Sequence, residues 1–195
     1  MRMTPLKRLL PQVLPQVLPC PSSMALDALQ FMAVDFCTQT EVWSERFQEP
    51  LAAGDTVLCL SAPGEAVIVR VRALWLDGSE LSSSAYSSEG DVVRLEAPAT
   101  RSLTATAEAV LRPSRMAENI PQEILEEWGD IIAYGALAKL KAMSGRHVEW
   151  ADAQGAGLAL QAYNEGVARA RGRVLRRRHG NGRGTLRLGG FQEVL

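Results

Sequence analysis

Residues 120–171 read IPQEILEEWGDIIAYGALAKLKAMSGRHVEWADAQGAGLALQAYNEGVARAR, and this stretch decides the fold. Apolar residues in its first half recur at a spacing of three and four, which predicts a helix over residues 120–143. Gly145 then interrupts the pattern. The same spacing resumes near Trp150, so that a further helix is predicted over residues 150–172.

Small residues line one face of the second of these helices, including Ala156, Ala159 and Ala170. A face of alanine and glycine lets another helix backbone approach closely, so we expect a tight helical hairpin. The tryptophans are spaced too widely in sequence to form a stacking platform, and we expect them to be packing anchors. The positions predicted to pack the subunit are Trp43, Trp128, Gly135, Gly157 and Gly166.

Upstream, apolar residues after Ser22 and Ser23 predict a first helix over residues 24–43. From residue 56 to residue 111 the texture changes to short β-branched runs divided by Gly, Pro or Asp, which predicts strands. Asp77 and Gly78 fit a tight hairpin turn. The expected fold class is therefore α+β, an α-helical bundle of three main helices with a small antiparallel β-sheet insertion and extended arms at both ends.

The first arm, residues 1–23, carries a proline at positions 11, 15 and 19. Because proline removes backbone donors, this segment is predicted to be an extended, polyproline-like arm rather than a signal helix. No apolar run reaches the roughly 20 residues that a membrane-spanning helix needs, so no membrane contact is expected. Residues 24–172 are then the body of the protein.

The second arm, residues 173–195, is basic and rich in glycine. From residue 169 to the end the chain has eight arginines and one acid, Glu193, which gives +7. Since the whole chain has a net charge of −1, residues 1–168 carry −8. Glycine opposes order in a free helix, and we therefore expect this arm to be ordered by a partner.

Residue patterns typical of catalysis or of cofactor and metal binding are not found in the sequence. The three cysteines, Cys20, Cys37 and Cys59, share no metal-ligand spacing with the two histidines, His147 and His179, and are expected to be reduced thiols. The segment GAGLAL at 155–160 lacks the preceding strand of a dinucleotide-binding turn. We therefore expect no enzyme, no cofactor and no metal. Acids interpreted as solvated helix faces are Asp35, Glu41, Glu126, Glu127 and Asp130.

Two interpretations of the arginine tail remain open. Arginines neutralise DNA phosphates and release counterions, which is typical of nucleic-acid binding. They also pair with carboxylates on an acidic protein surface. The apolar residues Leu186, Leu188 and Phe191 near the end of the tail favour docking into a protein, because a DNA-binding tail has no need of them.

Three segments suggest a family: DFC-x-x-T-x-x-W from Asp35, EEW-x-x-I-x-x-GAL from Glu126, and a small-residue last helix that ends in ARAR at residues 168–171. Together they resemble the head-to-tail adaptor (connector, or tail tubular gatekeeper) proteins of tailed bacteriophages. The similarity covers residues 24 to 172, nearly the whole body.

The resemblance implies a structural virion protein that forms a ring, usually of twelve copies, between the portal and the tail. Such a ring extends the channel for genomic DNA without reading its sequence and supplies the platform for tail or nozzle subunits. It implies assembly in the host cytoplasm and a final place at the head–tail junction. The portal-contact candidates are Arg173, Arg176, Arg177, Arg178, Arg183, Arg187 and Phe191; the tail-facing candidates, in the loop 81–90, are Ser83, Tyr86 and Ser88.

Overall fold

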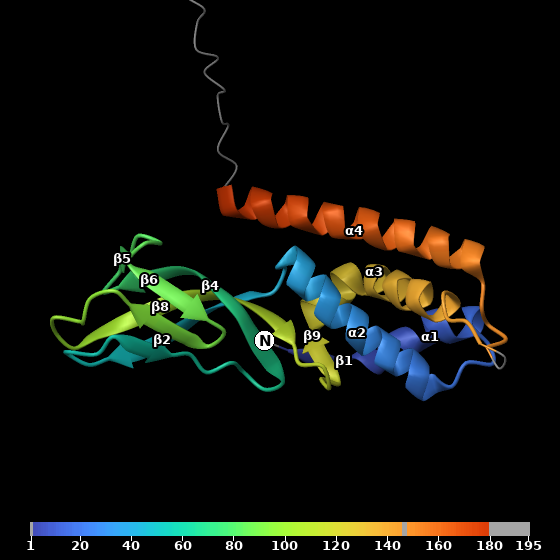
Figure 1. Cartoon of the computed structure of the whole chain (residues 1–195), viewed down its shortest axis with the longest axis horizontal. Helices are drawn as coiled ribbons and strands as arrows, with labels where there is room; N and C mark the ends of the chain where they lie inside the picture. Colours follow the sequence, from blue (N-terminus) through green and yellow to red (C-terminus); the bar gives the residue numbers. More distant parts are fainter. Residues whose placement is uncertain (1, 146–147, 180–195) are drawn as a thin grey trace, which may run out of the picture.

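The computed structural model describes residues 2–145 and 148–179, which form a β unit and a helical unit side by side (Figure 1). The predicted three-helix bundle with a small sheet is wrong. The described residues contain four α-helices and nine strands in three antiparallel sheets, 43% helix and 28% strand. The β part is thus larger than predicted, and its buried side chains share one apolar cluster with those of the helices.

The β unit is built from a four-stranded and a three-stranded sheet. The first has the order β2-β8-β4-β5, and the second has the order β3-β7-β6. Their strands are β2 (Ser44–Leu51), β3 (Val57–Cys59), β4 (Ala66–Leu76), β5 (Ser79–Glu80), β6 (Tyr86–Glu89), β7 (Val92–Leu95) and β8 (Leu103–Pro113). Buried side chains from both sheets, such as Leu74, Val93 and Ala107, belong to one apolar core.

The sheets are larger than predicted because two strands lack an apolar pattern. The segment SERFQEPL forms β2, which pairs along its whole length with β8. In the segment 81–90, which was predicted to be a loop, residues 86–89 form β6, paired with β7. The hairpin at Asp77 and Gly78 is confirmed: both residues have positive φ, 47° and 83°, and join β4 to β5.

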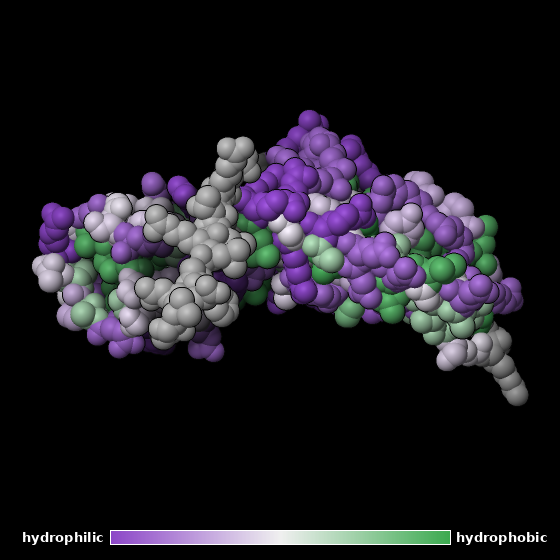
Figure 2. Space-filling model, turned by 90° about the horizontal axis from the view of Figure 1, so that it is seen from above, coloured by the Kyte–Doolittle hydropathy of each residue, from purple (hydrophilic) through white to green (hydrophobic). Residues whose placement is uncertain are grey.

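The helical unit contains three long helices, which are α2 (Ser22–Thr40), α3 (Gln122–Lys141) and α4 (Ala153–His179). The helices predicted over 24–43 and 120–143 are confirmed within a few residues. In Figure 1, α2 and α3 lie next to each other and α4 runs along their top, with its last turns reaching toward the β unit. Figure 2, seen from above, shows hydrophobic atoms toward the end of the molecule where α4 begins and hydrophilic atoms where α4 ends.

The prediction of an extended N-terminal arm is wrong. Residues 3–5 form β1 (Met3–Pro5), which pairs with β9 (Asn119–Pro121) just before α3. The 3-10 turns η1 (Leu6–Leu9) and η2 (Leu14–Gln16) flank the short helix α1 (Leu10–Val13). Two of the prolines are compatible with these short helices. Pro11 stands in the first turn of α1 and Pro15 in the first turn of η2, where the backbone N–H of a residue has no partner within the helix. Leu6, Leu9, Val13 and Val17 are buried at helical spacing, and the segment belongs to the core.

The last helix is longer than predicted and extends to His179 instead of ending at residue 172. The basic arm therefore does not begin at residue 173, since residues 173–179 continue α4. Leucine, valine and arginine at these positions are compatible with helix, and the glycines that break helices come later in the sequence. The remainder of the predicted arm, 180–195, lies outside the described residues.

Glycines let α4 pack closely on α3. A β-carbon at Gly166 would fall on the side chain of Ile131, and one at Gly135 would lie 2.6 Å from Met32 Cε and 2.9 Å from Tyr163 Cδ2. The predicted helical hairpin is thus present, and glycine is required at these two positions. By contrast, a β-carbon at Gly157 would meet nothing within 4 Å.

We predict that Gly166→Ala lowers the free energy of unfolding by about 1–3 kcal/mol, because the added methyl group overpacks the contact with Ile131. Gly157→Ala in the same helix is the matched control. It should raise the free energy of unfolding by about 0.5–1 kcal/mol, because alanine loses less backbone entropy in a helix. Urea unfolding followed by circular dichroism checks both. Equal effects at the two positions would contradict the packing described.

Candidate docking site at the end of α4

Helix α4 is held over the line between α2 and α3 by polar contacts on both sides. Tyr163 Oη donates to Asp35 Oδ2 of α2 at 2.6 Å. Burial is the main cause that raises the pKa of Tyr163, and this hydrogen bond is the second. Near its end, Arg171 Nε donates to the backbone oxygen of Gln39 in α2 at 2.8 Å. Arg173 forms an ion pair with Glu127 of α3. These contacts fix the direction in which the last turns of α4 point.

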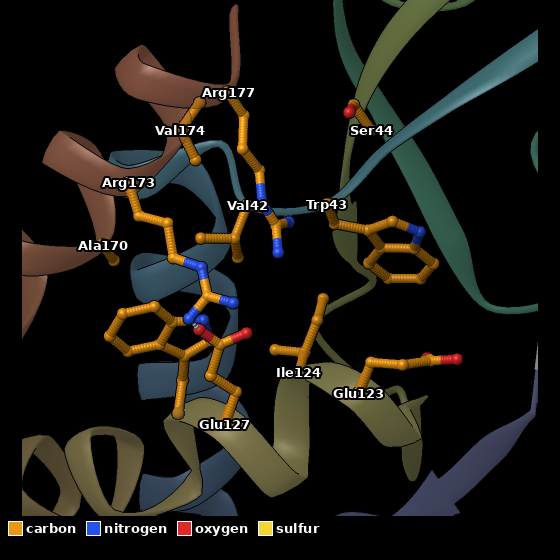
Figure 3. A pocket seen from close by; sticks show the side chains of 11 residues that line it. Val42, Trp43, Ser44, Glu123, Ile124, Glu127, Ala170, Arg173, Val174 and Arg177 are labelled. Atoms are coloured by element: carbon orange, nitrogen blue, oxygen red, sulfur yellow. Dashed lines mark hydrogen bonds and ion pairs between the residues drawn. The ribbon is translucent and has the colours of Figure 1, made fainter. Parts of the chain in front are cut away.

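Beneath these last turns lies a cleft of about 400 Å³ between α4, the first turn of α3 and the chain that enters β2. Figure 3 shows Arg177 reaching into this cleft toward Val42, and Arg173 joined to Glu127 at its side. Val42, Ile124 and Val174 supply apolar walls. Unlike Arg173, Arg177 makes no ion pair with another described residue. The cleft thus presents an available guanidinium group beside apolar surface.

A second cleft, of about 500 Å³, continues from the first along the face of the β unit. Arg177 and Val174 line both clefts. The second one adds Arg72 and Trp75 from β4, and Glu108 from β8. The end of α4 therefore stands over a continuous depression at the boundary of the two units. The lining also contains Glu123 and Glu127 in the first cleft and Glu41, Glu80 and Glu108 in the second, so the group that could meet a carboxylate of a partner there is Arg177, beside the apolar walls.

The boundary is fixed by Glu41, which ends α2 in the left-handed conformation, φ 56°. Its carboxylate accepts from Arg70 Nη2 at 2.5 Å and from Arg72 Nη2 at 2.7 Å, both in β4. The Arg72 side chain is only 5% exposed, and its charge is balanced by Glu41 and, at 3.7 Å from Arg72 Nη1, by Glu108 Oε1. Burial alone would raise the pKa of Glu41, but the hydrogen bonds from the two arginines outweigh burial and lower it.

Of the predicted portal-contact residues, Arg173, Arg176 and Arg177 lie on the last two turns of α4 and are exposed. Arg178 is in the same helix. Arg183, Arg187 and Phe191 lie outside the described residues. The structure thus brings the first arginines together at one end of the helix and places them above the boundary between the units.

The predicted tail-facing residues lie on the β unit. Ser83 is exposed in a turn. Tyr86 and Ser88 lie in β6 and are half-buried, with Tyr86 Oη donating to the backbone oxygen of Arg72 at 3.4 Å and Ser88 Oγ accepting from Val71 N at 3.4 Å. Within this chain the latter two side chains face β4. Contact of this segment with a tail protein stays a prediction.

The predicted packing residues have different surroundings. Trp43 is 2% exposed and donates through Nε1 to Glu45 Oε1 at 2.9 Å. Trp128 packs against Phe36 with ring centroids 5.9 Å apart. Gly135 and Gly166 serve the contact of α4 with its neighbours, whereas Gly157 faces open space. Four of the five positions therefore pack within the chain.

Sequence reasoning missed the roles of three acids that it interpreted as solvated, one of which is Glu127, the partner of Arg173. Asp35 is bonded to Tyr163, and Glu41 is bonded to two arginines of a strand. A signal for the role of Glu41 was present, because Arg70 and Arg72 in AVIVRVRALWL stand two residues apart in an apolar strand. Side chains at i and i+2 share a face, and paired cations on such a face call for an acid.

Metal-binding groups, membrane-spanning helices and reactive thiols were also sought in the part of the chain that the structure describes. Within residues 2–145 and 148–179, no group of three His, Cys, Asp or Glu side chains is placed to hold a metal ion. No helix there is long and apolar enough to cross a bilayer. Burial raises the pKa of the Cys37 thiol to about 12, which keeps it protonated. No protein-family model matches this chain, and no protein of curated function matches its sequence.

We predict that Glu41→Gln lowers the free energy of unfolding at pH 7 by about 2 kcal/mol, because buried Arg72 loses its nearer anion and keeps only Glu108, whose Oε1 lies 3.7 Å from Arg72 Nη1. The folded-state pKa of Glu41 lies below its usual 4.5, so the stabilisation is complete above that value and is lost as pH falls through the folded pKa. The stabilities of the variant and the parent should therefore converge in acid.

Urea unfolding at a series of pH values from neutral to acid measures this difference. Glu89→Gln, which removes an exposed carboxylate from β6, is the control and should change stability by less than about 0.5 kcal/mol. A stability difference for Glu41→Gln that stays constant with pH would contradict the assigned ion pair.

Proposed function

We propose that this chain is a head-to-tail adaptor of a tailed bacteriophage, a structural virion protein without enzymatic activity. It forms a ring, of twelve copies by the resemblance, between the portal and the tail at the head–tail junction. The ring extends the DNA channel and carries tail or nozzle subunits. The resemblance of the three segments beginning at Asp35, Glu126 and Ala168 supports this proposal.

The observation that carries the portal contact is the arginine-bearing end of α4 above the two clefts. Arg177 brings a guanidinium group without an ion-pair partner among the described residues to a cleft with apolar walls. In the sequence two further arginines, Arg183 and Arg187, follow α4. A portal segment with carboxylate and apolar side chains is the complementary partner.

Charge distribution agrees with a channel through which DNA passes. Residues 1–168 carry −8, and exposed acids of α3 include Glu123, Glu126 and Asp130. A like-charged wall does not hold a moving duplex, whereas a basic wall binds it. In this proposal the arginines point to the portal protein and the acidic body is free to border the channel.

The alternative is a nucleic-acid-binding protein that grips phosphates with the same arginines. The cluster of arginines at the end of α4 favours it as an electrostatic footprint. Two features of the site weigh against it. Arg171 and Arg173 are engaged with Gln39 and Glu127, and the cleft beside Arg177 is partly apolar, which phosphate binding does not require.

The test compares binding to the portal ring encoded in the same genome with binding to duplex DNA. Three proteins are needed: the full chain, a chain that ends at His179, and Arg176→Ala/Arg177→Ala. Truncation after residue 172, where the basic arm was predicted to begin, is unsuitable because it also removes the Arg173–Glu127 ion pair. The control Arg94→Ala/Arg101→Ala removes two exposed arginines of the β unit.

We predict that the full chain and the control bind the portal as a closed ring in native mass spectrometry. The double arginine variant should bind about a hundredfold more weakly, since each of the two charged contacts contributes about 1.5 kcal/mol. Removal of residues 180–195 should weaken binding further. Binding to DNA alone, with an affinity that falls steeply with salt and depends on the same arginines, would replace the adaptor proposal with the alternative.

A further inference from the structure

An apolar groove of about 260 Å³ lies in the β unit, next to the turn that joins β4 to β5. Four leucines line it, which are Leu76 of β4, Leu81 just after β5, Leu95 of β7 and Leu103 of β8. Strands of both larger sheets thus contribute to its walls. Leu95 is 9% exposed, and the other three leucines are half-buried. Such a groove can receive apolar side chains of an extended segment.

Two acids without an ion-pair partner border the groove. Glu96 lines it, and Glu80 is the last residue of β5, directly before the leucine that follows this strand. Both side chains are exposed, and neither forms an ion pair with another residue that the structure describes. Nearby Arg101 is paired with Asp77 at 2.7 Å, so this pair adds no net charge. Arg94 directly precedes the wall leucine of β7, and its side chain points to the opposite face of that strand.

The complementary segment is apolar on one side and basic on the other, and the chain itself contains one. Residues 44–113, which include the β unit, have ten acids and six arginines, so their net charge is −4 and they attract a basic segment. After α4, residues 183–188 read RGTLRL. Successive side chains of an extended segment point to opposite sides, so that Leu186 and Leu188 share one side and Arg183 and Arg187 share the other. The two leucines match the apolar walls, and the two arginines match the two unpaired acids.

The end of α4 brings this segment within reach of the groove. Arg177 and Glu80 line the same cleft, and the residue after Glu80 already belongs to the wall of the groove. In Figure 1, β5 lies along the upper edge of the β unit, the side on which α4 ends. Leu186 follows His179 by seven residues. Seven extended residues span up to about 23 Å, and a tether of this length gives an effective concentration on the order of millimolar.

We propose that residues 183–188 of the free chain bind in this groove of the same chain, with their two leucines between the wall leucines and their two arginines paired with Glu80 and Glu96. The β unit thereby holds the basic arm on the chain itself, and a partner that binds the arm has to displace it from the groove. This contact goes beyond the proposed function and does not rest on it, because it requires neither a portal nor a second copy.

The test uses the full chain with the photo-crosslinking amino acid p-benzoylphenylalanine in place of Leu188. After irradiation at low protein concentration, mass spectrometry of the digested chain locates the crosslink and measures its yield. The groove variant Glu80→Lys/Glu96→Lys reverses the charge beside the groove, and both positions are exposed, so that folding is retained. The matched control is Glu89→Lys/Asp91→Lys, which reverses two exposed acids at the opposite end of the β6–β7 hairpin.

We predict that the parent forms crosslinks within one chain to residues 76–81 and 95–103. Their yield should fall at least about tenfold in the groove variant, because two attractive charge pairs become repulsive, and it should stay unchanged in the control. Arg183→Glu/Arg187→Glu in the arm should lower the yield to the same extent. The groove variant and the arm variant combined in one chain should restore the yield, since the charges are then exchanged between the two sides.

Each of the other outcomes overturns the inference. Absence of a crosslink within the chain, or crosslinks only at the clefts beside Arg177, would show that the arm does not bind the groove. Crosslinks between chains, which increase with protein concentration, would show that the arm binds a second copy. A full yield in the groove variant would contradict the charge pairs. None of these results bears on binding to the portal ring, which is measured separately, so that failure of this contact leaves the proposed function in place.

Discussion

The close packing of α4 on α2 and α3 is the constraint on which the other features of this protein depend. At Gly135 and Gly166 the helix lies so near its neighbours that a β-carbon has no room. The hydrogen bond from Tyr163 to Asp35 fixes its rotation about its own axis. Helix α4 has 27 residues and α3 has 20, and the last turns of α4 pass beyond the helical unit (Figure 1). The position of the arginine-bearing end of α4 is thus a consequence of the packing at Gly135 and Gly166.

The last turns of α4 lie above the boundary between the helical unit and the β unit. Glu41 ends α2 and binds Arg70 and Arg72 of β4, so that a single carboxylate links the end of a helix to the middle of a sheet. The same place contains the clefts that Arg177 enters from above. A docking partner that binds there touches α3, α4 and the β unit at once. Binding at such a site depends on how the two units are placed relative to each other, as the proposed role of joining two parts of an assembly requires.

The sequence predicted the helices well because their patterns are local. Three-and-four spacing located α2 and α3, and the small residues of α4 correctly indicated a close helical hairpin. The sheets were underestimated, because β2 and β6 are held by pairing with strands distant in sequence rather than by an apolar pattern of their own. The prolines of the first residues were weighed more heavily than the buried spacing of Leu6, Leu9, Val13 and Val17, and this produced a wrong prediction of an extended arm.

For the candidate site, sequence alone found the arginines but not what surrounds them. Their clustering is visible in composition, whereas the clefts and the junction at Glu41 arise from contacts between α2, α4 and β4. Likewise, the small residues of α4 were interpreted as one packing face, and the structure leaves one of them, Gly157, facing open space. Burial is shared among several elements, so the helical pattern of one element does not tell which of its apolar residues stay uncovered.

A cryo-EM reconstruction of the full chain bound to the portal ring tests the central claim most directly. The account predicts a closed ring in which the arginine-bearing ends of α4 contact the portal and the β units point toward the tail. A ring that meets the portal through its β units, or particles in which the chain coats DNA and leaves the portal bare, would contradict the account.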